Sequence, residues 1–394
     1  MGLANEVAII GFGSTKFGEN FTQSYFDMLV EAAYEAYADA EVAPEEIQAG
    51  WLGSCYAYAY TTEGNAGTSL AEPLRLFGIP VTRVANYCST GMDALRNACF
   101  AVACGEYDYA IVAGVEKMRD VPPRGSLVSQ HVGRGHPLYC KGRTAPGIFA
   151  LMGNRYFEVY GNSKDAMAQV AVKNHYNGSL NPKAHFQREI TVEQALKAPM
   201  IADPIGLFDA CPTTDGAAVL IITRKELARK LGRPYTMIKA IGMSVANGYF
   251  TAQFHQKWDF LGFPATQQAA QMAYRQAGIT DPVKEIDVAE VHDCFTITEI
   301  LNYEDLGFCG RGEGRRFILD GRSTLKGDLP VNTSGGLKSC GHPIGASGVR
   351  MVGNIHEQLL GKAGQRQIDA RLGLAHTLGG PGAVSCVVIL GLPD

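Results

Sequence analysis

The chain has 394 residues, of which 46% are hydrophobic and 19% charged, and its formal net charge is −4, a composition that excludes a disordered chain. The lack of a positive excess argues against a nucleic-acid-binding protein, and ten cysteines are too dilute for a disulfide scaffold. The 46 glycines exceed the ordinary share of ~7% without a Gly-X-Y period, so we expect them in tight turns and at close backbone approaches.

The chain start and the cysteine spacing bear on the compartment. The start, MGLANEVAIIGFG, lacks the basic residues, long apolar run and small-residue cleavage site of a secretory signal. No stretch reaches the ~18 apolar residues that a membrane helix needs, and the final GLPD is not a peroxisomal address. No CxxC pair is present, which disfavours a zinc ribbon or a redox dithiol. We therefore expect a cytoplasmic protein with free thiols and no membrane contact.

The predicted elements alternate between strands and helices along the chain. Short apolar or β-branched runs predict strands at 7–11, 109–113, 217–223, 287–291 and 383–391. Apolar residues at helical intervals predict helices at 25–40, 91–104, 266–278 and 348–360. This alternation favours an α/β fold with a mostly parallel sheet covered on both faces. Tyr56, Tyr58 and Tyr60 alternate at strand period, and we favour packing along one face over an acyl pocket for them.

The region from about Arg119 to Arg233 differs, with polar loops and several short helices. We interpret most of it as an insertion over the scaffold, a place where substrate contacts are often found. The two ends of the chain share an outline of strand, helix, Gly- or Cys-bearing elbow, helix and closing strand, which suggests a duplicated half. The predicted division is an N-terminal half of 1–118 plus 217–245, a covering insertion of 119–216 and a C-terminal half of 246–394.

The first segment that carries chemistry is VANYCSTGMDAL at 84–95. An apolar approach ends in Cys88, and small residues then lead into a helix. Because unpaired amides and the helix dipole lower a thiol pKa there, the position suits a reachable thiolate nucleophile. The alternative is a buried packing cysteine, the commonest fate of a free thiol.

The second segment is DVAEVHDCFTITE at 287–299, in which a strand leads into a polar tetrad and then a helix. His292, Asp293 and Cys294 at one strand end resemble an acid–base site. The alternative is a capped helix, with Asp293 at the N-cap and His292 satisfied by backbone groups.

Two glycine-rich loops complete the set. NTSGGLKSCGHPIGASG at 332–348 surrounds His342 with five glycines, and the following Pro343 biases the histidine towards a fixed turn. LAHTLGGPGAV at 374–384 contains His376 before the final strand, and its amides could form an oxyanion hole. A structural histidine and a plain tight turn are the respective alternatives.

Together, one cysteine and three histidines on such loops support a Cys/His nucleophilic site more strongly than any single motif does. The HExxH and HxE…CxxC patterns are absent, so we expect no catalytic metal. GxxxxGK[ST] is also absent, and no GxGxxG follows the first strand, which sets aside a P-loop and a nicotinamide-dependent dehydrogenase.

In this order and at these separations, the four segments resemble the thiolase superfamily over nearly the whole chain. VAIIGFGSTKF at 7–17, GVEKM at 114–118 and the tail at 379–391 extend the resemblance. His-Asp-Cys-Phe at 292–295 resembles the tetrad of sterol-carrier-type and archaeal-type acetoacetyl-CoA thiolases, and Gly-His-Pro at 341–343 fits all groups. The resemblance implies a thiolase fold, with two duplicated βαβαβ-type halves in a five-layer αβαβα arrangement and an inserted covering loop domain.

The resemblance also implies roles. Cys88 would carry the acyl group, His342 would accept its proton and then help bind the thioester oxygen, and His292 would complete the first oxyanion site. A second oxyanion site would use the amide of Cys88 and an amide of the 376–380 turn, which contains Leu378, Gly379 and Gly380.

One departure concerns the acid/base that moves the α-carbon proton. Many thiolases have a second catalytic cysteine in a Cys-x-Gly motif on the last loop, and His376 aligns at that place here. In the sterol-carrier type the tetrad cysteine is the candidate, so we rank Cys294 first and His376 second. Cys386 lies within the last strand and is expected in the core.

The resemblance further implies coenzyme A and acyl-CoA as substrates, with no tightly bound cofactor, and a homodimer or tetramer. Relatives of the archaeal type can pair with a small zinc- and OB-fold acyl-CoA-binding protein. Candidates for the phosphates of coenzyme A, with a solvated loop face as the alternative, are Arg119, Arg124, Arg134, Lys141 and Arg143.

Three other functions share the scaffold. They are a thiolase-fold acyltransferase or condensing enzyme with a small partner protein, a steroid side-chain aldolase, and a non-catalytic thiolase-like subunit. Aldolase members tend to lack the nucleophilic cysteine, so Cys88 disfavours that function. The joint presence of Cys88, His292, Cys294 and His342 argues against a non-catalytic subunit.

Overall fold

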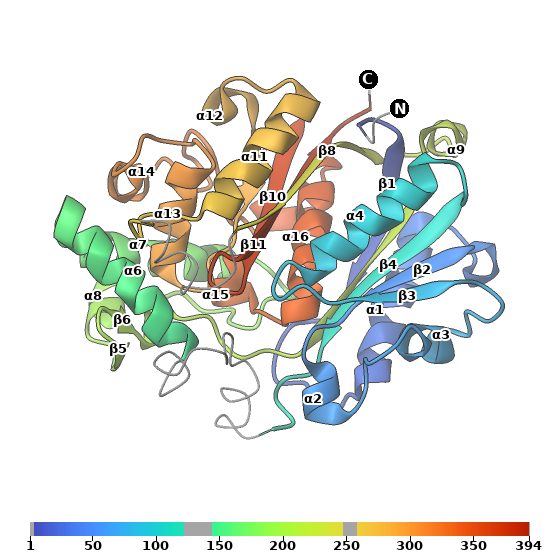
Figure 1. The fold of residues 1–394 in the computed structure, drawn as a ribbon, viewed down its shortest axis with the longest axis horizontal. Helices are drawn as coiled ribbons and strands as arrows, with labels where there is room; N and C mark the ends of the chain where they lie inside the picture. Colours follow the sequence, from blue (N-terminus) through green and yellow to red (C-terminus); the bar gives the residue numbers. More distant parts are fainter. Residues whose placement is uncertain (1–3, 122–143, 247–257, 394) are drawn as a thin grey trace.

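The computed structural model describes residues 4–121, 144–246 and 258–393 (Figure 1). The strands are β1 (Val7–Ser14), β2 (Ala49–Gly53), β3 (Val81–Val84), β4 (Tyr109–Glu116), β5 (Met200–Ala202), β6 (Ile205–Gly206), β7 (Gly216–Arg224), β8 (Thr236–Val245), β9 (Val288–Glu290), β10 (Leu372–Gly379) and β11 (Val384–Gly391). The α-helices are α1 (Tyr25–Ala40), α2 (Ala57–Thr61), α3 (Thr68–Leu74), α4 (Thr90–Ala103), α6 (Ala145–Tyr160), α7 (Lys164–Ser179), α8 (Val192–Leu196), α9 (Lys225–Lys230), α11 (Pro264–Ala277), α12 (Pro282–Glu285), α13 (Thr296–Asp305), α14 (Gly314–Leu319), α15 (Gly336–Cys340) and α16 (Ile344–Leu359). Three 3₁₀ turns are η1 (Pro44–Glu46), η2 (Leu207–Asp209) and η3 (Gly364–Arg366).

Within the described residues, nine strands form one mixed sheet in the order β3-β2-β4-β7-β1-β8-β11-β10-β9. The expectation of a mostly parallel sheet is wrong. Only the β2–β3, β2–β4 and β9–β10 pairs are parallel, whereas β1, β4, β7, β8, β10 and β11 meet their other neighbours antiparallel. The reason is connectivity, because β7 returns from the insertion into the middle of the sheet and β10–β11 is a hairpin.

The helices divide this sheet into two stacked halves. The only register between β1 and β8 pairs Ala8 with Met237 and Ile9 with Thr236, so the halves meet along a short seam. Helices α1 and α3 pack on one face of the first half and α11 on one face of the second, while α4 and α16 contact each other and lie between the halves (Figure 1). Together these layers make the expected five-layer αβαβα arrangement.

The central strands of the first half, β1, β4 and β7, are buried on both faces, so alternate residues enter different cores. On β1, Ile9 packs on the side of α4 and α16, whereas Ile10 packs on the side of α1. On β4, Val112 and Ile111 divide in the same way. This is the period of two that a pleated strand imposes, and it explains why these segments are continuous apolar runs.

Several predicted elements match the structure closely. Helix α1 spans the predicted residues because Ser24 caps it: Ser24 Oγ accepts from the Asp27 amide at 3.1 Å and the Asp27 carboxylate accepts from the Ser24 amide at 2.8 Å. The alternation of the tyrosine run does not correspond to a strand, since Ala57–Thr61 forms helix α2. Of the three tyrosines, Tyr56 lines a largely apolar cavity, against the preference for simple packing. No helix among the described residues combines the length and apolar character needed to cross a bilayer.

Candidate active site

Cys88 lies on the elbow between β3 and α4. Thr90 holds this elbow, because its Oγ1 accepts from the Asn86 amide at 2.7 Å and donates to the Tyr87 carbonyl at 2.5 Å. Ser89 is the N-cap residue of α4, which begins at Thr90. The helix N-terminus that we expected beside Cys88 is therefore present, and Cys88 is half-buried there.

His292 leaves the carboxyl end of β9, and its carbonyl accepts from Asn302 Nδ2 at 2.7 Å. Its own Nδ1 is buried without a hydrogen-bond partner among the described residues. The capped-helix alternative is wrong, because Phe295 is the N-cap residue of α13 and the Asp293 carboxylate accepts instead from amides of α15, that of Leu337 at 2.6 Å. Asp293 thus ties the His292 segment to the loop that precedes His342.

His342 lies between α15 and α16. The hydrogen bonds around its ring define which of the two ring nitrogens can accept a proton. Ser347 Oγ is 2.7 Å from His342 Nδ1 and donates to the Pro343 carbonyl at 2.8 Å. Because a serine hydroxyl has one proton, it must accept from Nδ1–H. The neutral ring then carries its lone pair on Nε2, which is buried without a partner in the described part of the chain. His342 is therefore oriented to accept a proton.

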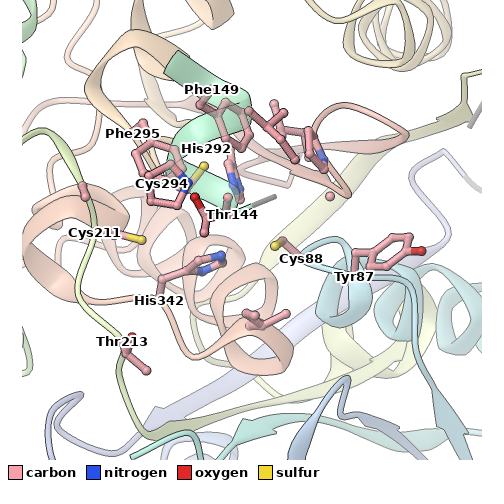
Figure 2. A pocket seen from close by; sticks show the side chains of 18 of the residues that line it. Tyr87, Cys88, Thr144, Phe149, Cys211, Thr213, His292, Cys294, Phe295 and His342 are labelled. Atoms are coloured by element: carbon pink, nitrogen blue, oxygen red, sulfur yellow. The ribbon is translucent and has the colours of Figure 1, made fainter. Parts of the chain in front are cut away.

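The structure brings Cys88 and the two histidines together at one cavity. The Cys88 sulfur and one nitrogen from each of His292 and His342 lie within 4.8 Å of one another, and the two rings stand at 86° with centroids 5.2 Å apart. Figure 2 shows the Cys88 sulfur facing both imidazoles across a cavity of about 490 Å³. The same sulfur and nitrogens would also suit zinc as ligands, although the spacing equally fits a proton-transfer pair.

Burial sets the protonation states of this cluster. It lowers the pKa of His342 to about 3 and that of His292 well below its ordinary value, so both rings are neutral near pH 7. It also raises the pKa of the Cys88 thiol well above 9, and the nearby Cys55, Cys211 and Glu116 act in the same direction. The expected lowering of the thiol pKa by the helix N-terminus is therefore wrong, because burial has the largest effect on this thiol and raises its pKa. A nucleophilic role for Cys88 would require a neighbouring base, and His342 Nε2 has no other partner among the described residues.

These protonation states predict the pH dependence of Cys88 alkylation. With a thiol pKa raised above 9, the thiolate fraction is small at pH 7, so the rate with iodoacetamide should rise about tenfold per pH unit between pH 7 and 9. Peptide mapping by mass spectrometry after timed alkylation would isolate Cys88 from the other thiols. A rate that is flat from pH 7 upward would contradict this and indicate a thiolate–imidazolium pair in the free enzyme.

Two more thiols line the cavity. Cys294 is 7% exposed, with its Sγ 3.9 Å from Thr298 Oγ1, and burial raises its pKa well above 9. Cys211, whose amide donates to the Cys294 carbonyl at 2.9 Å, also lines the cavity, and burial raises its pKa to about 12. The sequence analysis did not single out Cys211, because no motif surrounds it. Both thiols hold their protons at neutral pH and face the space beside Cys88 (Figure 2).

His376 lies apart from these groups. It is fully buried in β10, its Nε2 is 3.1 Å from both Thr266 Oγ1 and Ser385 Oγ, and its Nδ1 is 3.5 Å from the His292 amide. It is not among the residues that line the cavity. The position of His376 disfavours its expected acid/base role, because the residue is buried against the His292 amide and does not line the cavity.

The carboxyl end of β10 meets the elbow that carries Cys88, as the oxyanion hypothesis requires. Leu378, Gly379 and Gly380 line the cavity. A turn over 376–380 was expected, but residues 376–379 belong to strand β10, which pairs with β11 as far as Gly379 and Val384. A Cβ on Gly379 would lie 2.8 Å from the Cys88 nitrogen and 2.7 Å from the Tyr87 Cβ, so only glycine permits this approach, and the backbone of this strand end forms the wall beside the Cys88 amide.

Comparison with known proteins agrees with this geometry. The family described as "Thiolase, N-terminal domain" matches residues 7–226, and that described as "Thiolase C-terminal domain-like" matches residues 246–392. The chain belongs to the thiolase family. It is 39% identical to an acetyl-CoA acetyltransferase of Methanothermobacter thermautotrophicus over 98% of this chain and 99% of that protein. This thiolase is therefore an acyltransferase.

One further relative and one solved structure are also similar to the chain. Sterol carrier protein 2 of Oryctolagus cuniculus is 32% identical to the thiolase over 98% of this chain and 72% of that protein. A solved structure described as "Ltp2-ChsH2(DUF35) aldolase" superposes with a TM-score of 0.86 at 26% identity, covering 99% of this chain and 98% of that one. The fold thus accompanies more than one reaction, and the side chains at the cavity must distinguish them.

Glu116 is a further residue of the thiolase site that sequence reasoning missed. It lies at the end of β4, fully buried, and burial raises its pKa to about 7. Its carboxylate accepts from the amides of Cys55, Tyr56 and Ala57 and from that of Gly345, at 2.5–3.1 Å. Glu116 therefore joins the segment that carries Tyr56 to the first turn of α16, directly after His342. No pattern in the sequence marks a glutamate with such long-range partners.

We expect Glu116→Gln to lower both stability and turnover. A glutamine amide offers one acceptor oxygen and turns an NH₂ group towards backbone N–H donors, so the free energy of unfolding should fall by about 2 kcal/mol or more. Urea unfolding and steady-state kinetics would measure both effects. Glu313→Gln is the matched control, because Glu313 is exposed and accepts from the Gly310 amide alone. Equal, small effects of the two substitutions would contradict the role of Glu116.

Proposed function

We propose that the thiolase makes or cleaves 3-ketoacyl-CoA through a covalent acyl-Cys88 intermediate. One observation carries the proposal: a thiol sulfur and two neutral imidazole nitrogens lie within 4.8 Å of one another at the wall of a largely apolar cavity. A thiolate adds readily to a carbonyl carbon, and the imidazoles supply the base and the hydrogen-bond donors that the reaction needs.

In the cleavage direction, His342 Nε2 takes the Cys88 proton and the sulfur adds to the 3-keto carbon. The bond between C2 and C3 then breaks, leaving the acyl group on sulfur and the electron pair on the enolate of acetyl-CoA. The protonated His342 Nε2 becomes a donor to the enolate oxygen, so one nitrogen serves first as base and then as oxyanion donor. His292 is the second donor at that oxygen, and preorganised donors in a dry site stabilise developing charge strongly.

Cys294 supplies the proton that the enolate carbon needs. Its thiol holds a proton at neutral pH because burial raises its pKa, and it faces the cavity beside Cys88 (Figure 2). The thiol of coenzyme A then gives its proton to the Cys294 thiolate and adds through its sulfur to the acyl-Cys88 carbonyl, and the tetrahedral oxygen is bound by the Cys88 amide and an amide of residues 378–380. Collapse of that adduct releases acyl-CoA, and the departing Cys88 sulfur takes back the proton held by His342. In reverse, Cys294 removes the α-proton and two acyl-CoA molecules are joined.

The cavity wall favours an acyl chain as its occupant. Its apolar residues come from the covering insertion, the tetrad and the start of α16, namely Ile148, Phe149, Ile201, Leu207, Phe295 and Ile344. Of the five candidate contacts to coenzyme A phosphates, Arg119 forms an ion pair with Glu19. Arg124, Arg134, Lys141 and Arg143 lie outside the described residues. We propose coenzyme A as a substrate with no tightly bound cofactor.

The test combines intact mass with turnover. Incubation with acetoacetyl-CoA, without free coenzyme A, should add one acetyl group to the protein, and added coenzyme A should remove it. Thiolysis of a series of 3-ketoacyl-CoA substrates of increasing length would then define the preferred chain. No covalent acylation by any member of the series would refute the proposal and favour a non-catalytic subunit.

A second candidate function is a reaction carried out with a small partner protein. The similarity to the structure described as "Ltp2-ChsH2(DUF35) aldolase" favours it, and a partner with an OB fold would fit the resemblance of this chain to archaeal-type thiolases. Cys88 counts against an aldolase, because retro-aldol cleavage needs no acyl-enzyme. Full thiolysis by the purified chain alone would exclude a required partner, and gel filtration would test the homodimer or tetramer that we also propose.

A further inference from the structure

A second cavity is lined in part by α16 and shares no lining residue with the cavity at Cys88. Its volume is about 510 Å³, and it is lined by the end of β1, the segment after α7, one face of α16 and the turn η3. Arg350, Asn354 and Glu357 share this face, because residues three and four apart on a helix are neighbours. Arg366 folds back from η3, with its Nη1 3.4 Å from Asn354 Oδ1 and its Nη2 3.4 Å from Glu357 Oε2.

The deepest polar groups of this cavity have unused hydrogen-bond donors. Arg350, Asn354 and Arg366 are each 3–5% exposed. Arg350 uses Nη1 on Glu290 and Ser334, which leaves its Nε and Nη2 without a partner among the described residues. Arg366 Nε and Asn354 Nδ2 are also buried without one. Four donors without a partner among the described residues, three of them on guanidinium groups, therefore belong to residues that line one cavity.

The available acceptors cannot satisfy these donors. Glu290 is already engaged by the Ser334 amide at 2.9 Å and by two hydroxyls. Lys183 and Lys362 at the cavity wall are half-exposed and paired with Glu35 and Asp39, so their ion pairs lie outside the deep part. Buried N–H groups of charged side chains are costly to leave unpaired. A ligand rich in acceptor oxygens would complete them.

We propose that this second cavity binds a phosphate-type oxyanion through Arg350, Asn354 and Arg366. A phosphate group offers several acceptor oxygens and two negative charges, which suits donors that a guanidinium presents in a fork. The site is separate from the Cys88 cavity, and the proposal does not depend on the proposed reaction. Inorganic phosphate and the phosphate of a small metabolite share this chemistry, so both serve as probes.

Thermal unfolding tests the site. Inorganic phosphate or glycerol 3-phosphate, titrated against sodium chloride at constant ionic strength, should raise Tm saturably, by roughly 2 °C or more. The arm with the lower half-saturation identifies the source. Asn354→Asp places a carboxylate among the donors, so half-saturation should rise at least about tenfold. Asn162→Asp is the control, since it makes the same charge change at an exposed residue.

A second variant changes the response in the opposite direction. Glu357→Gln removes the one acid of the cavity wall and keeps an acceptor for Arg366, so phosphate should bind more tightly to it. Both variants keep the catalytic cluster, and unchanged acyl transfer would show that they fold. No saturable rise in Tm, or an equal rise in the wild type and Asn354→Asp, would mean that the cavity holds only water and would overturn the proposal.

Discussion

Replacing Cys88 by alanine is expected to abolish the covalent acyl-enzyme and to lower kcat for thiolysis by at least ~10⁴-fold. The expectation rests on the cluster geometry, in which the Cys88 sulfur faces two imidazoles that each have one ring nitrogen without a partner among the described residues. Without the sulfur, His342 has no proton to accept and the acyl group has no carrier. The fold should be unaffected, because Cys88 is half-buried at the cavity wall and does not belong to either large core.

Intact mass after incubation with acetoacetyl-CoA is the direct measurement for Cys88→Ala, and the increment of one acetyl group should be missing. Cys104→Ala is the matched control, because Cys104 caps the other end of the same helix and is exposed. Acetylation of Cys88→Ala at the wild-type rate would move the nucleophile to Cys211 or Cys294, which line the same cavity. Peptide mapping would then locate the acetyl group.

The elements that could be predicted from the sequence are those with local causes. Helix α1 has its capping box at Ser24 and apolar residues at helical spacing, so residues close to it in the sequence determine its bounds. Strand direction has no such local signal, since a buried apolar run such as β7 reads the same in either orientation. The interpretation of residues 56–60 was wrong because alternation over five residues is too short to distinguish a strand from one turn of helix.

The same distinction between local and long-range causes applies to the residues of the candidate site. Cys88, His292 and His342 could be identified because each lies in a segment of unusual composition and because the segments together resemble one family. Cys211 and Glu116 are placed by partners distant in the sequence, namely the Cys294 carbonyl and the amides of 55–57 and 345. His376 was included because its loop aligned, but its position behind the His292 backbone depends on packing between β10 and β11.

The assignment of the acid/base to Cys294 carries the second large expected effect. In Cys294→Ala, acetyl exchange from acetyl-CoA should survive, because it forms no carbanion. Acylation by acetoacetyl-CoA does form one, so it should be impaired. Cleavage of the carbon–carbon bond should fall by ~10²–10⁴-fold, the usual contribution of a positioned proton donor. The separation follows from the mechanism, because acyl exchange with coenzyme A forms no enolate, whereas thiolysis of a 3-ketoacyl-CoA does.

Cys211→Ala is the sharp control for this separation. Cys211 lies in the same cavity wall, carries a thiol with a raised pKa and contacts the Cys294 backbone, so it shares every property of Cys294 except the proposed role. Stopped-flow thiolysis and acetyl-CoA exchange should both stay near wild type in Cys211→Ala, whereas only exchange should survive in Cys294→Ala. If the pattern of the two variants is reversed, Cys211 is the proton donor. If neither variant loses thiolysis, the proton comes from neither thiol, and His342 becomes the first candidate donor, since its Nε2 holds the Cys88 proton at that point.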